Sequence, residues 1–154
     1  LNALAGLRPA GHSDAAVLMT LVDNLRHAAD VLAPAGRQVL TEPLNSRDTP
    51  GFYLDRPAPA LAVIAASGRP NLRLQYDIYH AQVMEGDLAR TLERHLPAIG
   101  HIQLADNPGR HQPGTGEINF PFLFQHLEAI GYAGWIGAEY VPDGPSEGSF
   151  GWIE

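Results

Sequence analysis

The chain contains 154 residues with a formal net charge of −7 and no cysteine. It is long enough for one compact domain, but a complete eight-unit α/β barrel typically needs about 250 residues. The lack of cysteine excludes disulfides and thiolate metal sites, and the acidic balance argues against a nucleic-acid-binding surface. No apolar run approaches the roughly 20 residues of a membrane span, so we expect no membrane binding. The acidic balance suits a cytoplasmic enzyme that binds no nucleic acid.

Strand-like and helix-like segments alternate along the whole chain. Residues 3–7 resemble the end of a strand, and Ser13 and Asp14 then begin a helix with apolar residues at helical spacing as far as Leu32. Further helices are expected through Ala60 and Ile64 to Gly68, over 87–99 with Asp87 as the cap, and over 120–130. The strands that alternate with these helices are expected over 38–42, 72–78, 101–105 and 135–140.

This alternation, without any hairpin signal, predicts an α/β fold with a parallel sheet. No Gly-x-Gly-x-x-Gly motif follows a strand, which removes the commonest signature of an open, doubly wound sheet. Periodicity alone does not separate a barrel from an open sheet, so both arrangements remain compatible with the pattern.

Polar residues share one side of the predicted strands. The strand over 72–78 alternates apolar and polar side chains: Leu72, Leu74 and Tyr76 on one side, Arg73, Gln75 and Asp77 on the other. In a barrel, the apolar side packs on the helices and the polar side faces the interior. Burying an unpaired charge is strongly unfavourable, so interior carboxylates need partners or a metal, whereas Arg73 can simply pair with Gln75 or Asp77.

Four strands carry an acid or an amide at or near their C-terminal ends: Glu42, Asp77, Gln103 and Glu139. The C-terminal ends of parallel barrel strands share one face, and active sites form on that face. Any one of these residues alone is more simply explained as a loop cap or a salt-bridge partner. Their matched placement favours a joint site, whose carboxylate and amide oxygens suit Mg²⁺ or Mn²⁺ better than Zn²⁺.

Two further residues lie close to this face. His80 follows Asp77 by three residues, where it can bind a substrate oxygen or move a proton, or be an ordinary hydrogen-bonded loop histidine. Arg110 lies in the Gly- and Pro-rich loop 106–118, where a guanidinium can bind a substrate carboxylate; the alternative is a solvated side chain. Glu117, in the same loop, is expected to serve the fold.

Several long segments form a recognisable set: Thr-Glu-Pro-Leu-Asn-Ser-Arg-Asp-Thr-Pro-Gly-Phe (41–52), Leu-Gln-Tyr-Asp-Ile-Tyr-His (74–80), Gly-His-Ile-Gln-Leu-Ala-Asp-Asn-Pro-Gly-Arg (100–110), Pro-Gly-Thr-Gly-Glu-Ile-Asn (113–119) and Gly-Trp-Ile-Gly-Ala-Glu-Tyr (134–140). Together they resemble the hydroxypyruvate isomerase family of the xylose isomerase-like barrel superfamily. The resemblance implies that residues 1–154 are the C-terminal part of a single (β/α)₈ TIM barrel domain. They would supply about strands 4–8 with the intervening helices, and the N-terminal strands and last helix would lie outside the chain.

The resemblance also implies roles for individual residues. The ligands of a divalent metal, Mg²⁺ or Mn²⁺, would be Glu42, Asp77, Gln103 and Glu139. Glu42 and Glu139 would be the acid/base pair, and His80 and Arg110 would contact a small hydroxy-keto acid substrate. The implied reaction is the interconversion of hydroxypyruvate and tartronate semialdehyde. Related sugar epimerases usually have histidine at the position of Gln103, so an amide at this position makes the chain resemble the hydroxypyruvate isomerases more than the epimerases.

Three alternatives remain. A 2-oxo-tetronate isomerase fits the same residues, because one extra carbon changes only the pocket wall. An endonuclease IV-like phosphodiesterase shares the barrel, but it needs His-rich zinc sites and a basic DNA-binding face, which the charge of −7 and the amide of Gln103 disfavour. The isolated chain can also be inactive, because a five-strand arc has open edges. A homo-oligomer of the full-length protein is left open.

Overall fold

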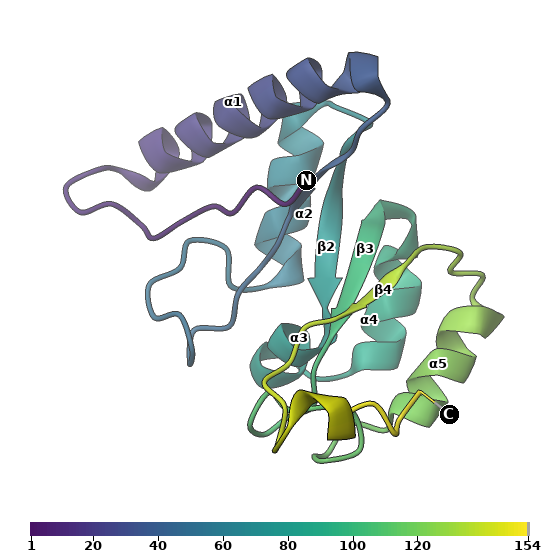
Figure 1. Cartoon of the computed structure of the whole chain (residues 1–154). Coiled ribbons are helices and arrows are strands. Elements are labelled where there is room, and N and C mark those ends of the chain that lie inside the picture. Colours follow the sequence, from purple (N-terminus) through teal and green to yellow (C-terminus); the bar gives the residue numbers. More distant parts are fainter. Residues whose placement is uncertain (154) are drawn as a thin grey trace.

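The computed structural model describes residues 1–153, which form a parallel sheet flanked by helices (Figure 1). The four strands β1 to β4 are neighbours in chain order and cover Val39–Thr41, Leu72–Asp77, Ile99–Leu104 and Ile136–Ala138. Each neighbouring pair runs parallel, which confirms the predicted α/β architecture. Within the described residues, no helix is both long enough and apolar enough to span a membrane.

Helices connect the successive strands, as parallel pairing requires. α1 precedes β1, α2 joins β1 to β2, α3 and α4 join β2 to β3, and α5 joins β3 to β4. α1 packs against α2, and α2 packs against β2 (Figure 1). The helices α1 to α5 cover Asp14–Leu32, Pro57–Ser67, Ile78–Met84, Leu88–His95 and Phe120–Ala129, and short 3₁₀ helices cover Ala33–Ala35, Leu96–Ala98 and Ser146–Gly148.

Local signals set most helix ends. The Ser13 side chain accepts a hydrogen bond from the backbone N–H of Ala16 at 3.3 Å, so the predicted cap of α1 is confirmed. Gly68 ends α2 in the left-handed region, with φ of 63°, as its position predicted. Asp87 is the N-cap residue of α4, as predicted. Its φ is 47°, and its side chain makes no capping hydrogen bond within residues 1–153.

Three elements differ from the sequence-based expectation. The helix expected over 87–99 ends at His95, because Pro97 has no N–H to continue the α-helical hydrogen bonds, and Ile99 begins β3. The strand end expected over 3–7 lies earlier, where Leu1 and Ala3 exchange backbone hydrogen bonds with Leu40 at 2.8 and 2.7 Å. The short α3 was not expected, since its residues directly follow a strand.

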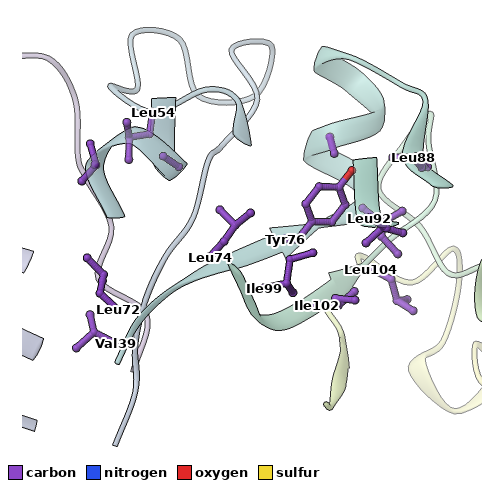
Figure 2. Close-up of a cluster of buried hydrophobic side chains, with 14 of the residues drawn as sticks. Val39, Leu54, Leu72, Leu74, Tyr76, Leu88, Leu92, Ile99, Ile102 and Leu104 are labelled. Atoms are coloured by element: carbon purple, nitrogen blue, oxygen red, sulfur yellow. The ribbon is translucent and has the colours of Figure 1, made fainter. Parts of the chain in front are cut away.

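The predicted alternation of side chains along β2 is confirmed. Leu72, Leu74 and Tyr76 are at most 1% exposed and pack in a cluster with Ile102 and Leu104 of β3 (Figure 2). Burial of each such side chain stabilises the fold by about 1.5–3 kcal/mol. The cluster therefore anchors the sheet to its helices and fixes which residues of β2 face the other way.

Arg73, on the opposite side of β2, does not pair with Gln75 or Asp77 as expected. Its guanidinium donates hydrogen bonds to three backbone carbonyl oxygens at the start of β3. These belong to Pro97 at 2.7 Å, Ile99 at 2.9 Å and Ala98 at 3.2 Å. These carbonyls lie near the N-terminal end of the sheet. Arg73 therefore fastens the beginning of β3, and Asp77 is left free for other contacts.

Candidate active site

The C-terminal ends of the strands bring the predicted site residues to one side of the sheet. Asp77 is the last residue of β2, and the strand register places it opposite Gln103 of β3. Gln103 is in turn opposite Gly137 of β4, two residues before Glu139. Glu42 directly follows β1. Parallel pairing thus carries residues from four segments of the chain to a common edge, as the sequence predicted.

Glu42, Asp77 and His80 form a buried cluster at this edge. One candidate ligand atom from each residue lies within 4.8 Å of the others. Asp77 caps α3, because its Oδ1 accepts the backbone N–H groups of Tyr79 at 2.7 Å and His80 at 3.2 Å. The first turn of α3 therefore carries His80 back over Asp77, which explains why the predicted three-residue spacing brings the two side chains together.

Each residue of the cluster has one polar atom that is buried without a hydrogen-bond partner among residues 1–153: Glu42 Oε1, Asp77 Oδ2 and His80 Nε2. The other carboxylate oxygens are occupied, since Glu42 Oε2 accepts from Asn2 at 2.6 Å and Asp77 Oδ1 from the backbone. An unsatisfied buried polar group typically costs about 1–3 kcal/mol. Buried carboxylate oxygens without partners, in residues whose candidate ligand atoms lie within 4.8 Å of one another, fit a divalent metal ion.

Burial changes the proton affinities of the cluster. Burial, followed by the charge of Asp77, raises the pKa of Glu42 from 4.5 to about 7. Burial also raises the pKa of Asp77 from 3.8 to about 6, although the backbone N–H of His80 opposes it. Burial and then the nearby Arg110 charge lower the pKa of His80 from 6.5 to about 4. A carboxyl group that titrates near neutral pH can both accept and return a proton, and the neutral imidazole can donate a hydrogen bond.

Gln75 links the cluster to Gln103, a role that the sequence did not identify. Its amide nitrogen donates to Glu42 Oε2 at 2.7 Å and to the amide oxygen of Gln103. Gln75 is buried, and the period-two alternation of β2 is the one signal that placed it on this side of the sheet. Both hydrogens of one NH₂ group therefore orient two of the predicted ligands.

Arg110 and Glu139 form an ion pair at the rim of the site. A guanidinium nitrogen of Arg110 lies 2.7 Å from Glu139 Oε2, and the Glu139 side chain is 54% exposed. The guanidinium also lies over the ring of Tyr79, 5.4 Å from its centroid. Glu139 is therefore not part of the buried cluster, although its charge acts on Glu42 and Asp77.

The loop that carries Arg110 is organised by Asp106, which the sequence did not single out. Asp106 is fully buried, and its carboxylate accepts four backbone N–H groups at 2.9–3.1 Å, from Asn107, Gly114, Gly116 and Ile118. A Cβ on Gly116 would lie 2.3 Å from the Asn107 carbonyl oxygen, so the loop needs glycine there. Glu117 accepts hydrogen bonds from Gln82 and Asn107 at 3.1 and 2.5 Å, in keeping with its expected structural role.

Comparison with known proteins identifies the family. Residues 1–154 match the family described as xylose isomerase-like TIM barrel. The chain belongs to this family. Members similar to it include the hydroxypyruvate isomerase of Escherichia coli K12, 46% identical over the whole chain and 60% of that protein, and the 2-oxo-tetronate isomerase of Cupriavidus necator, 43% identical over the whole chain and 59% of that protein. The resemblance inferred from the sequence motifs is thereby confirmed.

A solved structure of the family supports the barrel architecture. The protein described as AP endonuclease, family 2, from Brucella melitensis superposes with a TM-score of 0.95 and 44% sequence identity, over 99% of this chain and 59% of that one. The chain thus spans about 60% of the length of the relatives that it matches. Its parallel sheet and helices form part of a TIM barrel, as predicted.

Proposed function

We propose that the complete protein that contains this chain is an isomerase of short hydroxy-keto acids that interconverts hydroxypyruvate and tartronate semialdehyde. The observation that carries the proposal is the convergence of Glu42 Oε1, Asp77 Oδ2 and His80 Nε2, which are buried and without partners in residues 1–153. The name of the Escherichia coli relative supports the choice of reaction. In this proposal the chain supplies about strands 4–8 of one barrel, and the other strands lie outside it.

The proposed metal site consists of Glu42, Asp77, Gln103 and Glu139. Gln75 would orient Glu42 and Gln103 toward it, through the hydrogen bonds described above. When bound there, Mg²⁺, or Mn²⁺ in its place, would polarise the substrate oxygens and stabilise the negative charge that develops on an enediolate. For Glu139 to join the other ligands, its carboxylate has to leave Arg110, which costs little because the ion pair is exposed.

The proposed reaction moves a hydrogen between adjacent carbons. One glutamate, Glu42 or Glu139, removes the proton from C3 of hydroxypyruvate, and the same or the opposing glutamate delivers a proton to C2. The hydroxyl proton on O3 passes to O2, so that atoms and charge balance. Arg110, freed from Glu139, would hold the substrate carboxylate, and His80 would contact a substrate oxygen.

A 2-oxo-tetronate isomerase is the second candidate, because the relative from Cupriavidus necator carries that name at 43% identity. The extra carbon of this substrate would be accommodated by the wall of the pocket and would need no change in the cluster. The two candidates are separated by kcat/KM values for hydroxypyruvate and 2-oxo-tetronate, measured on the complete protein with and without Mg²⁺. Turnover of neither substrate in the presence of Mg²⁺ would reject both assignments.

A phosphodiesterase acting on DNA is the remaining reading, raised by the description of the Brucella melitensis structure. The net charge of −7 disfavours a DNA-binding face. An assay for cleavage of abasic-site DNA, run on the same preparation, provides the direct comparison. Cleavage together with no isomerisation would favour the endonuclease.

A further inference from the structure

Asn45, in the loop between β1 and α2, contacts the ring nitrogen Nδ1 of His80, whereas Nε2 is the nitrogen nearer to Asp77. Asn45 is fully buried. Its backbone N–H donates to His80 Nδ1 at 3.1 Å, and its side-chain nitrogen Nδ2 lies 2.7 Å from the same atom. Two groups of one residue therefore meet a single ring nitrogen.

The rest of the turn decides which end of the Asn45 amide faces the imidazole. Asn45 Oδ1 accepts the backbone N–H groups of Arg47 at 3.1 Å and Asp48 at 2.8 Å, so this atom has to be the oxygen. Asn45 Nδ2 also lies 3.1 Å from Asp48 Oδ2, a carboxylate oxygen that can only accept from it. The amide is thus oriented by its hydrogen bonds, and both groups that reach His80 Nδ1 are donors.

Two donors at Nδ1 determine the tautomer of His80. Nδ1 has to offer its lone pair, and a neutral imidazole then carries its hydrogen on Nε2. A doubly protonated ring would place an N–H against two other N–H groups, which is repulsive. A nitrogen that carries a hydrogen has no lone pair for a metal, so His80 differs in chemistry from its neighbours Glu42 and Asp77 although it lies within ligand distance of them.

The hydrogen on Nε2 has no acceptor among the described residues. Nε2 is buried, and the nearest carboxylate oxygen, Asp77 Oδ2, lies 3.9 Å away, which is too long for a hydrogen bond. We propose that Asn45 is a positioning residue that holds His80 as the Nε2–H tautomer, so that His80 donates a hydrogen bond to a substrate oxygen and does not ligate the metal. The substrate half of this inference rests on the proposed function, whereas the tautomer does not.

The tautomer is tested by nuclear magnetic resonance on the complete protein labelled with ¹⁵N-histidine. The chain has 7 histidines, so the His80 signals are assigned by their loss in His80→Gln. Long-range ¹H–¹⁵N correlations are expected to show a protonated Nε2 and an unprotonated Nδ1. A protonated Nδ1 in the unsubstituted protein would overturn the proposal, whether or not any variant folds.

Asn45→Asp tests whether Asn45 is the cause. The carboxylate keeps the oxygen that accepts from Arg47 and Asp48 and leaves the backbone N–H at 3.1 Å in place, but it replaces the side-chain donor at 2.7 Å by an acceptor. Because a charged acceptor at the shorter distance outweighs the remaining donor, Nδ1 is expected to become protonated. The matched control is Tyr79→Phe, which removes a hydrogen bond to the same Asp48 at 2.7 Å without touching Nδ1 and should leave the tautomer unchanged. An unprotonated Nδ1 in folded Asn45→Asp would contradict the role of the Asn45 side chain.

The substrate half is tested by turnover of Asn45→Asp and by metal binding of His80→Gln. With Mg²⁺ present, Asn45→Asp is expected to lower kcat about 10- to 100-fold, because the Nε2–H that donates to a charged substrate oxygen is lost. The Mg²⁺ affinity of His80→Gln, measured by calorimetry without substrate, is expected to stay close to that of the unsubstituted protein. Loss of Mg²⁺ binding in His80→Gln would show that His80 is a ligand and would overturn the proposal. If the unsubstituted protein turns over no substrate, the proposed function fails while the tautomer result stands.

Discussion

The buried cluster of Glu42, Asp77 and His80 and the ion pair of Arg110 and Glu139 use the same kinds of groups in opposite surroundings. In the cluster, burial raises the pKa of Glu42 to about 7 and leaves one oxygen of each carboxylate without a partner in residues 1–153. At the rim, Glu139 is 54% exposed and is neutralised by Arg110. An exposed pair of this kind contributes about 0–1 kcal/mol to stability. The two parts of the site therefore differ in burial and not in residue type. The buried cluster is suited to hold a ligand firmly, whereas the exposed ion pair can exchange partners.

The largest effect is expected from Glu139→Gln. In the complete protein, turnover should fall about 10²- to 10⁴-fold, because the proposed acid/base group is lost. The unfolding temperature should hardly change, since the side chain is exposed and its ion pair adds little stability. Steady-state kinetics and thermal unfolding measure the two quantities. Glu128→Gln, an exposed substitution on α5, is the control, and near-normal turnover of Glu139→Gln would reject its role.

Asp106→Asn tests how much Asp106 stabilises the loop that carries Arg110. Asparagine has one acceptor oxygen and an NH₂ group in place of a carboxylate that accepts four backbone N–H groups. The free energy of unfolding should fall by about 3 kcal/mol, measured by urea denaturation. Asp143→Asn, on the exposed surface, is the matched control. Unchanged stability would mean that the loop is held by other contacts.

Gln75→Leu tests whether Gln75 orients the proposed metal ligands Glu42 and Gln103. The substitution places an apolar side chain of similar size at the same buried position and removes both hydrogen bonds, to Glu42 and to Gln103. Mg²⁺ affinity should fall about 10- to 100-fold, as expected for the loss of a group that orients metal ligands. Isothermal titration calorimetry measures the affinity without substrate. An unaltered affinity would show that Glu42 and Gln103 need no such support.

The smallest effect is a pH dependence of stability in the absence of metal. The folded-state pKa of Glu42 is raised, so the native state binds more protons than the unfolded state between about pH 4.5 and 7, and the contribution of Glu42 to stability declines as pH rises through that window. His80, with its lowered pKa, acts in the opposite sense, so a variant is needed to isolate Glu42. Relative to the unsubstituted protein, Glu42→Gln should gain stability from pH 4.5 to 7, measured by urea denaturation. A stability difference that does not change with pH would contradict the raised pKa of Glu42. Saturating Mg²⁺ should reverse the pH dependence of this difference.

Local rules in the sequence determined much of the fold and part of the site. The period-two alternation of β2 predicted the burial of Leu74 and Tyr76 and placed Asp77 on the other side, because strand geometry alone sets that alternation. The parallel arrangement followed from the order of strands and helices, and it predicted that Glu42, Asp77, Gln103 and Glu139 reach one edge. Element ends were predicted less well: the end of α4 at His95 depends on Pro97 and on where β3 starts.

Only the tertiary structure decided how these groups pair. Asn45 and His80 lie 35 residues apart, Glu42 and Gln75 lie 33 apart, and Arg110 and Glu139 lie 29 apart, so no local pattern relates them. Each pairing depends on loops that leave the strands and return, and the shape of a loop is set by contacts such as those of Asp106. The sequence determined which chemical groups are present and on which side of the sheet they start. The folded chain decided which of them are buried, and burial gives Glu42 and His80 their shifted pKa values.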